Sequence, residues 1–285
     1  MRHAILGAGG IGGLLAAALA RAGGDVVLLL RPDSLERYDG RLAVQSAVLG
    51  DFEVDVSAVA ALDRDVDALW VTTKATQLEA SLALAPPDRV GDAVVIPLLN
   101  GVDHLALLRT HYHNVVAAAI RVESERLSPT RIHQSSPFLR MELAGAEPIA
   151  DEVRAAGIDC TLRTDELSLL WDKLAFLAPL ALATTALEAP LGAVREDARY
   201  RGCQDEALAV ARAEGAHIDE EALRALQAGA PREMQSSMQK DVAAGRQPEL
   251  DAIAGPILRG GRRHGIPVAS TEELVQLVAA RAGSA

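Results

Sequence analysis

The chain has 285 residues, 49% hydrophobic and 24% charged, a composition typical of a globular protein long enough for two cores. Its formal charge of -11 disfavours nucleic acid and membrane surfaces as partners, because both are anionic. The two cysteines, Cys160 and Cys203, are far apart and fit a cytoplasmic protein without disulfides.

The first half of the chain alternates short apolar runs with helical patterns. Strands are predicted at residues 3–6, 25–30, 68–72, 93–98 and 115–120, and helices at residues 11–22, 77–85 and 104–111. Residues 33–56 form a polar excursion without a predicted element. Strands that alternate with helices form right-handed crossovers, so we expect an α/β Rossmann-type domain with a mainly parallel, doubly wound sheet.

The second half is predicted to be all-α. After a last short strand at residues 160–164, helical patterns lie at residues 166–187, 197–214, 220–228, 249–264 and 271–282. Ser270, with Glu273 three residues later, forms a capping box and is the predicted N-cap of the last helix. We therefore expect two domains, residues 1–164 and residues 165–285.

One apolar stretch, residues 174–187, could suggest a membrane span. It is shorter than a bilayer requires, contains Pro179 and begins beside Asp172 and Lys173. A buried core helix explains it better, and no membrane partner is expected.

A glycine-rich turn lies between the first predicted strand and the first predicted helix. Its G-x-G-x-x-G spacing permits a tight turn, a close approach of a pyrophosphate to the backbone, and close packing of helix and strand. The N-terminus of the helix then offers free N–H groups to the phosphates. The residues predicted to bind a dinucleotide here are Gly7, Ala8, Gly9, Gly10, Ile11 and Gly12.

The residue at the end of the second strand indicates which dinucleotide is bound. NAD enzymes usually place Asp or Glu there, to accept a hydrogen bond from the ribose 2′-hydroxyl. This chain has Arg31, whose guanidinium suits the 2′-phosphate of NADP, although Asp33 follows closely. NADP is therefore the predicted cofactor.

Further polar residues follow predicted strands at the carboxyl edge of the parallel sheet, where doubly wound proteins bind their ligands. Lys74 and Asn100 each follow a predicted strand, at the carboxyl edge of the sheet. Ser124 is a further candidate for contact with the cofactor. Two histidines, His111 and His113, have no Cys or acidic neighbour at ligand spacing, so no metal is expected.

With these segments in place, the chain resembles the ketopantoate reductase family nearly from end to end. The matching segments are GAGGIGG, the strand that ends in Arg31, VTTKA, LLNGV, WDKLA, SSM with Asp241 after it, and Glu249 before the helix that ends in RRHGIPV. Their order and spacing are more specific than any one of them.

The resemblance implies a role for each matching residue. Lys173, in the W-x-K-L motif, would be the general acid, and Glu249 would lie at this lysine and at the ribose of the cofactor. Asn100 would contact cofactor and substrate, Lys74 would lie near the nicotinamide, and Ser237 would contact substrate. The implied reaction is the NADPH-dependent reduction of ketopantoate, a small 2-oxo acid, to pantoate in pantothenate biosynthesis. A homodimer is a further expectation.

These residue types suit the implied chemistry. Hydride delivery to the carbonyl of a 2-oxo acid develops negative charge on oxygen, which the ammonium of Lys173 could stabilise and then protonate. Glu249 would keep Lys173 charged and oriented. Ser237 and Asn100 could donate hydrogen bonds to the substrate carboxylate.

The chain departs from the family at three substrate-binding positions. Members that act on ketopantoate have asparagines four and eight residues after the catalytic lysine, and another near the following loop; here these positions hold Leu177, Ala181 and Leu191. A site that hydrogen-bonds a substrate hydroxyl discriminates strongly for it, so the loss should weaken the binding of ketopantoate. The alternatives are a related reductase for a more apolar 2-oxo acid or imine, a 3-hydroxyacid dehydrogenase, and a non-catalytic NADP-binding regulator.

Overall fold

The computed structural model describes residues 1–284, which divide into two compact units. The first unit contains Met1–Leu99 and His104–Glu166. The second contains the helices that follow Glu166, together with the short segment Asn100–Asp103. A segment from the α/β half of the sequence therefore belongs structurally to the helical unit.

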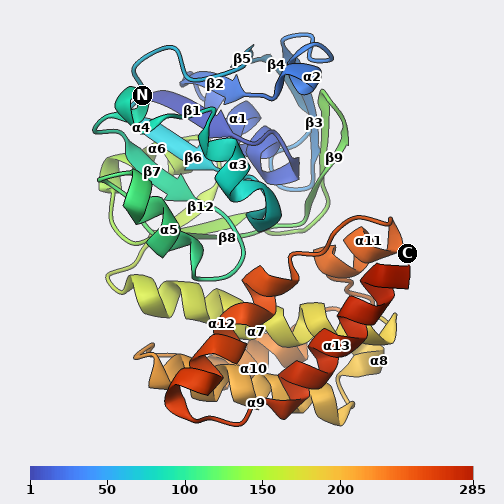
Figure 1. Cartoon of the computed structure of the whole chain (residues 1–285). Coiled ribbons are helices and arrows are strands. Elements are labelled where there is room, and N and C mark those ends of the chain that lie inside the picture. Colours follow the sequence, from blue (N-terminus) through green and yellow to red (C-terminus); the bar gives the residue numbers. More distant parts are fainter. Residues whose placement is uncertain (285) are drawn as a thin grey trace. The chain divides into compact units, whose positions relative to one another are not determined.

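A parallel sheet forms the centre of the first unit, in the order β5-β2-β1-β6-β7 (Figure 1). Its strands are β1 (Arg2–Leu6), β2 (Asp25–Leu29), β5 (Ser57–Val59), β6 (Ala68–Val71) and β7 (Val94–Pro97). Buried on both faces, the strands consist of nearly unbroken apolar residues, as parallel sheets require. The predicted α/β Rossmann-type fold is confirmed.

Two smaller mixed sheets complete the first unit. One has the order β4-β3-β10-β9, from Phe52–Asp55, Arg41–Ser46, Arg131–Gln134 and Ser124–Ser128. The other has the order β12-β11-β8, from Asp159–Leu162, Arg140–Leu143 and Ala118–Arg121. The prediction for residues 33–56 was wrong, because β3 and β4 lie there. The strand predicted at residues 115–120 is β8, which pairs antiparallel with β11.

Of the three helices predicted in the first unit, those at residues 11–22 and 104–111 are present and the one at residues 77–85 is shorter than predicted, whereas three further helices were not predicted. The helices of this unit are α1 (Gly10–Arg21), α2 (Pro32–Leu35), the 3-10 turn η1 (Ala75–Gln77), α3 (Leu78–Leu82), α4 (Pro87–Val90), α5 (His104–His111) and α6 (Glu147–Ala155). Helix α1 packs against β2 of the parallel sheet and against β3, β4, β9 and β10. It brings the glycine turn and strand β9 together.

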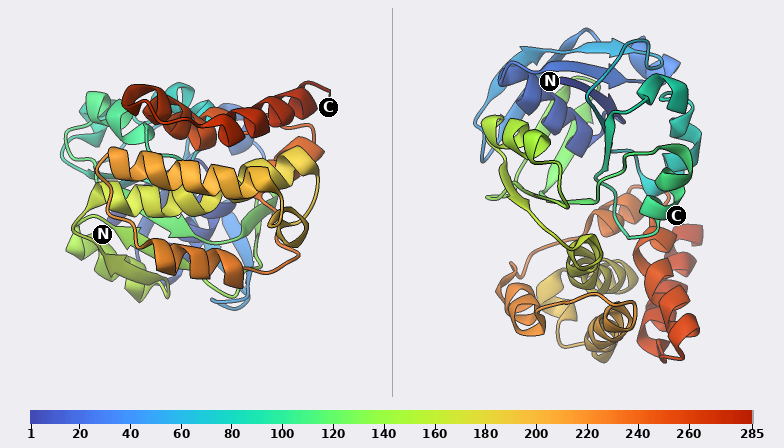
Figure 2. Two further views of the ribbon diagram at one scale, coloured as in Figure 1. Left: turned by 90° about the horizontal axis from the view of Figure 1, so that it is seen from below. Right: turned by 90° about the vertical axis from the view of Figure 1, so that its left-hand side faces the viewer.

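The second unit is helical throughout its described residues, as expected (Figure 2). Its helices are α7 (Glu166–Leu187), α8 (Leu191–Val194), α9 (Ala198–Ala213), α10 (Glu220–Gly229), α11 (Ser237–Ala243), α12 (Leu250–His264) and α13 (Ala269–Ser284). Helix α7 has the length and composition of a membrane span, but 72% of its most apolar window is buried inside the protein. It is a core helix.

The predicted N-cap of the last helix was wrong. Helix α13 already begins at Ala269, so Ser270 lies inside its first turn. The carboxylate of Glu206, on α9, accepts hydrogen bonds from the backbone N–H groups of Ser270 and Thr271, both at 2.8 Å. A side chain from another helix thus performs the capping that the local pattern assigned to Ser270.

A buried histidine makes the first unit sensitive to acid. His3 is fully buried, and its Nδ1 accepts a hydrogen bond from Nε1 of Trp70 at 3.3 Å. Burial and the nearby N-terminal ammonium lower the pKa of His3, although Glu152 opposes the shift. The unfolded chain therefore binds this proton more readily than the folded one. The free energy of unfolding is therefore lowered by His3 as the pH falls below about 6.5, where the imidazole of the unfolded chain takes up a proton.

We expect the free energy of unfolding, measured with urea, to fall between about pH 7.5 and about pH 5.5, and to fall less in a His3→Phe variant. His133, on β10, is exposed, so His133→Phe should keep the pH dependence of the native protein. An unchanged pH dependence in His3→Phe would contradict the assignment to His3.

Candidate active site

The glycine turn between β1 and α1 has the geometry of a phosphate cradle. Gly7 has a φ of 104°, which favours glycine, and a Cβ at Gly12 would lie 2.0 Å from the carbonyl oxygen of Gly7. A Cβ at Gly9 would meet no heavy atom of residues 1–284 within 4 Å. The turn is therefore tightly packed below and open at Gly9, where a pyrophosphate could approach the backbone at the start of α1.

Two side chains fix this turn from outside the motif. Oγ1 of Thr72, after β6, donates to the carbonyl of Gly7 at 2.5 Å, and Oγ of Ser124, on β9, donates to the carbonyl of Gly10 at 2.8 Å. Ser124 was a predicted cofactor residue, whereas Thr72 was not. The remaining predicted residues of the turn, Ala8 and Ile11, are half-buried and pack against the core of this unit.

Arginines gather beyond the end of β2. Arg31 is exposed before α2, and Nε of Arg37 donates to the carbonyl of Asp33 at 2.9 Å. Partial burial, together with the positive charges of Arg37 and Arg31, lowers the pKa of Arg126 on β9. Within residues 1–284, neither Arg31 nor Arg126 forms an ion pair with a carboxylate. These unpaired cations fit a phosphate dianion.

Arg31 was predicted from the sequence as a cofactor residue, whereas Arg126 was not. Arg126 lies on the edge strand β9, which no apolar run marked, and its position beside Arg31 and Arg37 depends on the packing of β9 against α1. The sequence carries no local signal for it.

Lys74 belongs to the first unit. It follows β6, directly before η1, and is half-buried. Because β1 and β6 are parallel neighbours, Lys74 and the glycine turn lie at the same carboxyl edge of the sheet.

The other predicted catalytic and substrate residues belong to the second unit. Lys173 is half-buried on α7, and Leu177 and Ala181 follow at four-residue intervals along the same helix face. Leu177 is half-buried, whereas Ala181 and Leu191, on α8, are each only 1% exposed. The positions that follow Lys173 on this face of α7 are therefore apolar and partly or fully buried.

Asn100 and Glu249, which are 149 residues apart in the sequence, are in direct contact. Nδ2 of Asn100 donates to Oε2 of Glu249 at 3.3 Å. Gly101, with a φ of 86°, permits this approach, because a Cβ there would lie 2.2 Å from the carbonyl oxygen of Ala252 in the first turn of α12.

An ion-pair network holds the same segment farther along α12. Arg259 contacts Asp103 at 2.5 Å and Asp251 at 2.7 Å. The segment Asn100–Asp103 is therefore fixed at both ends to the helix that follows Glu249.

The two serines of the S-S-M segment have different environments. Ser236 is buried and caps α11, since its Oγ accepts from the backbone N–H of Gln239 at 3.1 Å. The same Oγ lies 2.9 Å from Oγ1 of Thr184 on α7. Ser237 is exposed, which suits a residue that contacts a ligand. Helix α7 therefore carries Lys173 near one end and, through Thr184, holds the serine segment at the other.

Two family models match the chain, one to each half. "Ketopantoate reductase PanE/ApbA" matches residues 3–144, and "Ketopantoate reductase PanE/ApbA C terminal" matches residues 166–282. Together they cover most of both units.

Relatives and solved structures agree with these matches. A 2-dehydropantoate 2-reductase from Caulobacter vibrioides is 30% identical over 299 residues, which span 98% of either chain. The crystal structure of a PanE/ApbA family ketopantoate reductase from Ralstonia eutropha JMP134 has a TM-score of 0.88 at 28% identity and covers 100% of this chain and 99% of its own. A D-mandelate dehydrogenase solved with NADH and anilino(oxo)acetate shares the fold, with a TM-score of 0.90 at 21% identity over 100% of this chain and 99% of its own. The chain therefore belongs to the ketopantoate reductase family, and it is an oxidoreductase of the 2-dehydropantoate 2-reductase type.

Proposed function

We propose that this protein uses NADPH to reduce a 2-oxo acid to a 2-hydroxy acid, with ketopantoate as the first candidate substrate and Lys173 as the proton donor. The observation that carries the proposal is the contact of Asn100 with Glu249 in the unit that also contains Lys173. Residues from three distant parts of the sequence are thereby placed in one structural unit, as a shared role in binding and proton transfer would require.

Each residue has a part that its chemistry can perform. Bound NADPH would supply the hydride. Lys173 would donate a hydrogen bond to the carbonyl oxygen that receives negative charge, and would then transfer its proton to it. Glu249 would orient the side chains around it, because its carboxylate already accepts from Asn100. Ser237 would donate to the substrate carboxylate.

Lysine is an unusual choice in this protein, which supports a role in proton transfer. Of the 28 lysine and arginine residues, only Lys74, Lys173 and Lys240 are lysines. An arginine keeps its proton at any physiological pH, whereas a lysine can release it. A chain that supplies nearly all its positive charge as arginine has lysine at the position proposed for the acid.

The cofactor is proposed to be NADPH rather than NADH. Arg31, Arg37 and Arg126 concentrate positive charge beyond the end of β2, in a protein with a net charge of -11. A 2′-phosphate would neutralise that charge, while a 2′-hydroxyl would leave it without a counterion.

A second candidate substrate is a 2-oxo acid with a more apolar side chain. Leu177, Ala181 and Leu191 offer no hydrogen bond from their side chains to the hydroxyl of ketopantoate. The D-mandelate dehydrogenase that shares this fold was solved with anilino(oxo)acetate, an aromatic amide of oxalic acid whose oxo group stands next to the carboxylate as in a 2-oxo acid, and this ligand supports the second candidate. A homodimer and a cytoplasmic location stay predictions from the sequence.

The function is tested by the oxidation of NADPH with ketopantoate and a panel of branched, unbranched and aromatic 2-oxo acids. Because the side chains of Leu177, Ala181 and Leu191 offer the hydroxyl of ketopantoate no hydrogen bond, we expect kcat/KM for an apolar branched or aromatic 2-oxo acid to lie within about tenfold of that for ketopantoate. Preference for ketopantoate would mean that other side chains bind its hydroxyl. If no acid of the panel led to oxidation of NADPH, the proposed reaction would be contradicted.

Replacement of the proposed acid separates charge from proton transfer. We expect Lys173→Ala to lower kcat by about 10²–10⁴-fold, and Lys173→Arg, which keeps the charge, to restore only a small part of it. NADPH binding, followed by fluorescence titration, should stay near the native value in both variants. The control is Lys240→Arg, which exchanges an exposed lysine of α11 and should turn over normally. Full activity in Lys173→Ala would exclude the proposed mechanism.

Removal of one guanidinium tests the choice of cofactor. Since a hydrogen bond to a charged group contributes about 1.5–3 kcal/mol, we expect Arg126→Gln to raise KM for NADPH about tenfold or more without changing KM for NADH. Arg131→Gln, at an exposed arginine on neighbouring β10, should change neither value. An equal effect on both cofactors would show that Arg126 does not recognise the 2′-phosphate.

A further inference from the structure

The backbone hydrogen bonds of α7 are interrupted close to the proposed acid. Pro179 lies inside the helix, and a proline nitrogen carries no hydrogen. The carbonyl of Ala175, four residues earlier, therefore receives no bond from position 179. Ala175 is fully buried, so water does not easily replace the missing donor.

A glutamine from another helix supplies this donor. Nε2 of Gln227, on α10, donates to the carbonyl of Ala175 at 3.2 Å. Gln227 is only 4% exposed, and burial of its amide costs free energy unless the NH₂ group and the oxygen form hydrogen bonds. Its side chain thus occupies the position where the hydrogen bond of an uninterrupted helix is missing.

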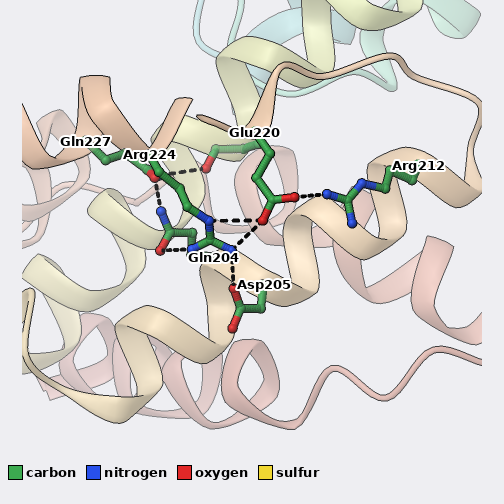
Figure 3. A network of polar contacts seen from close by, with 7 residues as sticks. Gln204, Asp205, Arg212, Glu220, Arg224 and Gln227 are labelled. Atoms are coloured by element: carbon green, nitrogen blue, oxygen red, sulfur yellow. Dashed lines mark hydrogen bonds and ion pairs between the residues drawn. The ribbon is translucent and has the colours of Figure 1, made fainter. Parts of the chain in front are cut away.

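The orientation of this amide is fixed by a chain of hydrogen bonds (Figure 3). Nη1 of Arg224 donates to Oε1 of Gln204 at 3.2 Å, and Nε2 of Gln204 donates to Oε1 of Gln227. A guanidinium can only donate and a backbone carbonyl can only accept, so both amides between Arg224 and Ala175 can point in one direction only. The NH₂ group of Gln227 must face the carbonyl of Ala175.

Charged residues at the surface hold the first member of this chain. Nη2 of Arg224 contacts Oδ1 of Asp205 at 2.8 Å and Oε1 of Glu220 at 2.7 Å (Figure 3). The other carboxylate oxygen of Glu220 pairs with Arg212. The polar chain therefore links the surface of α9 and α10 to the interrupted turn of α7.

This turn lies between Lys173 and Ala181, two of the predicted site residues on α7. Lys173 lies two residues before Ala175, and Ala181 lies two residues after Pro179. Thr184, farther along, contacts Ser236 and so holds the segment that carries Ser237. A change of bend at the proline would alter the separation of Lys173 from Ala181 and from Ser237.

We infer that Gln227 is a positioning residue for the reductase reaction, which fixes the backbone of α7 around Pro179 by donating to the carbonyl of Ala175, to which Pro179 cannot donate. The inference rests on the proposed function of Lys173. Gln227 itself touches neither substrate nor cofactor in this proposal; it acts through the backbone of Ala175.

The first test removes the donor without changing the length of the side chain. Gln227→Met should lower kcat about tenfold, because small displacements of reacting groups are costly, and leave KM for NADPH unchanged. Gln134→Met is the matched control, since Gln134 is also buried and hydrogen-bonded but lies on β10 in the first unit. It should lower the melting temperature without lowering kcat. An unchanged kcat in Gln227→Met would overturn the inference.

The second test returns the missing hydrogen to the backbone. In a Pro179→Ala background, the N–H of residue 179 can bond to Ala175 itself, so Gln227→Met should lower kcat about twofold or less there. A loss as large as in the native background would show that Gln227 does not act through this carbonyl, and would overturn the inference.

A readout that needs no turnover separates this inference from the proposed function. Trp171, buried on α7, is the only tryptophan left in a Trp70→Phe background. Gln227→Met should shift its fluorescence emission, and Pro179→Ala should reduce the shift; no shift would overturn the inference. Full activity in Lys173→Ala would instead refute the role of the lysine, whatever Trp171 reports.

Discussion

A buried helix with a proline inside it is the constraint on which the second unit depends. An interior proline costs a helix about 3 kcal/mol or more, and a buried carbonyl without a donor costs about 1–3 kcal/mol. In α7 the amide of Gln227 meets the second cost, and apolar packing around both halves offsets the first. Neighbouring helices therefore stabilise α7 around Pro179, and the helix depends on the completed unit for its stability.

Each unit has some of its candidate site residues where regular backbone is interrupted. In the first unit, β1 ends in a glycine turn whose carbonyls accept from Thr72 and Ser124. In the second, Glu249 directly precedes α12, and Asn100 reaches it because Gly101 lies against the first turn of that helix. Interrupted backbone leaves donors and acceptors for ligands, but it needs side chains from other elements to hold it.

Sequence patterns could predict features that local chemistry determines. The glycine turn, the apolar strands and the long helix with Lys173 are of this kind, since spacing and composition suffice for each. The proposed role of Arg126 depends on an unpredicted edge strand, and the proposed role of Gln227 depends on a carbonyl in another helix that Pro179 leaves without its backbone donor. The prediction of the N-cap of α13 failed because the capping side chain is distant in the sequence: Glu206 is 64 residues away from Ser270.

The chemical difference between arginine and lysine explains how the protein uses its basic residues. Arginine occurs where a permanent charge or a donor-only group is needed. Arg31 and Arg126 lie close together beyond the end of β2, and Arg224 fixes the direction of two buried amides. A lysine at position 224 would offer a flexible point charge in place of a planar fork. At position 173 the proposed mechanism reverses the requirement, because an acid in each catalytic cycle must lose its proton and regain it. Arginine cannot do so at physiological pH, so the proposed reaction, rather than the charge alone, explains a lysine there.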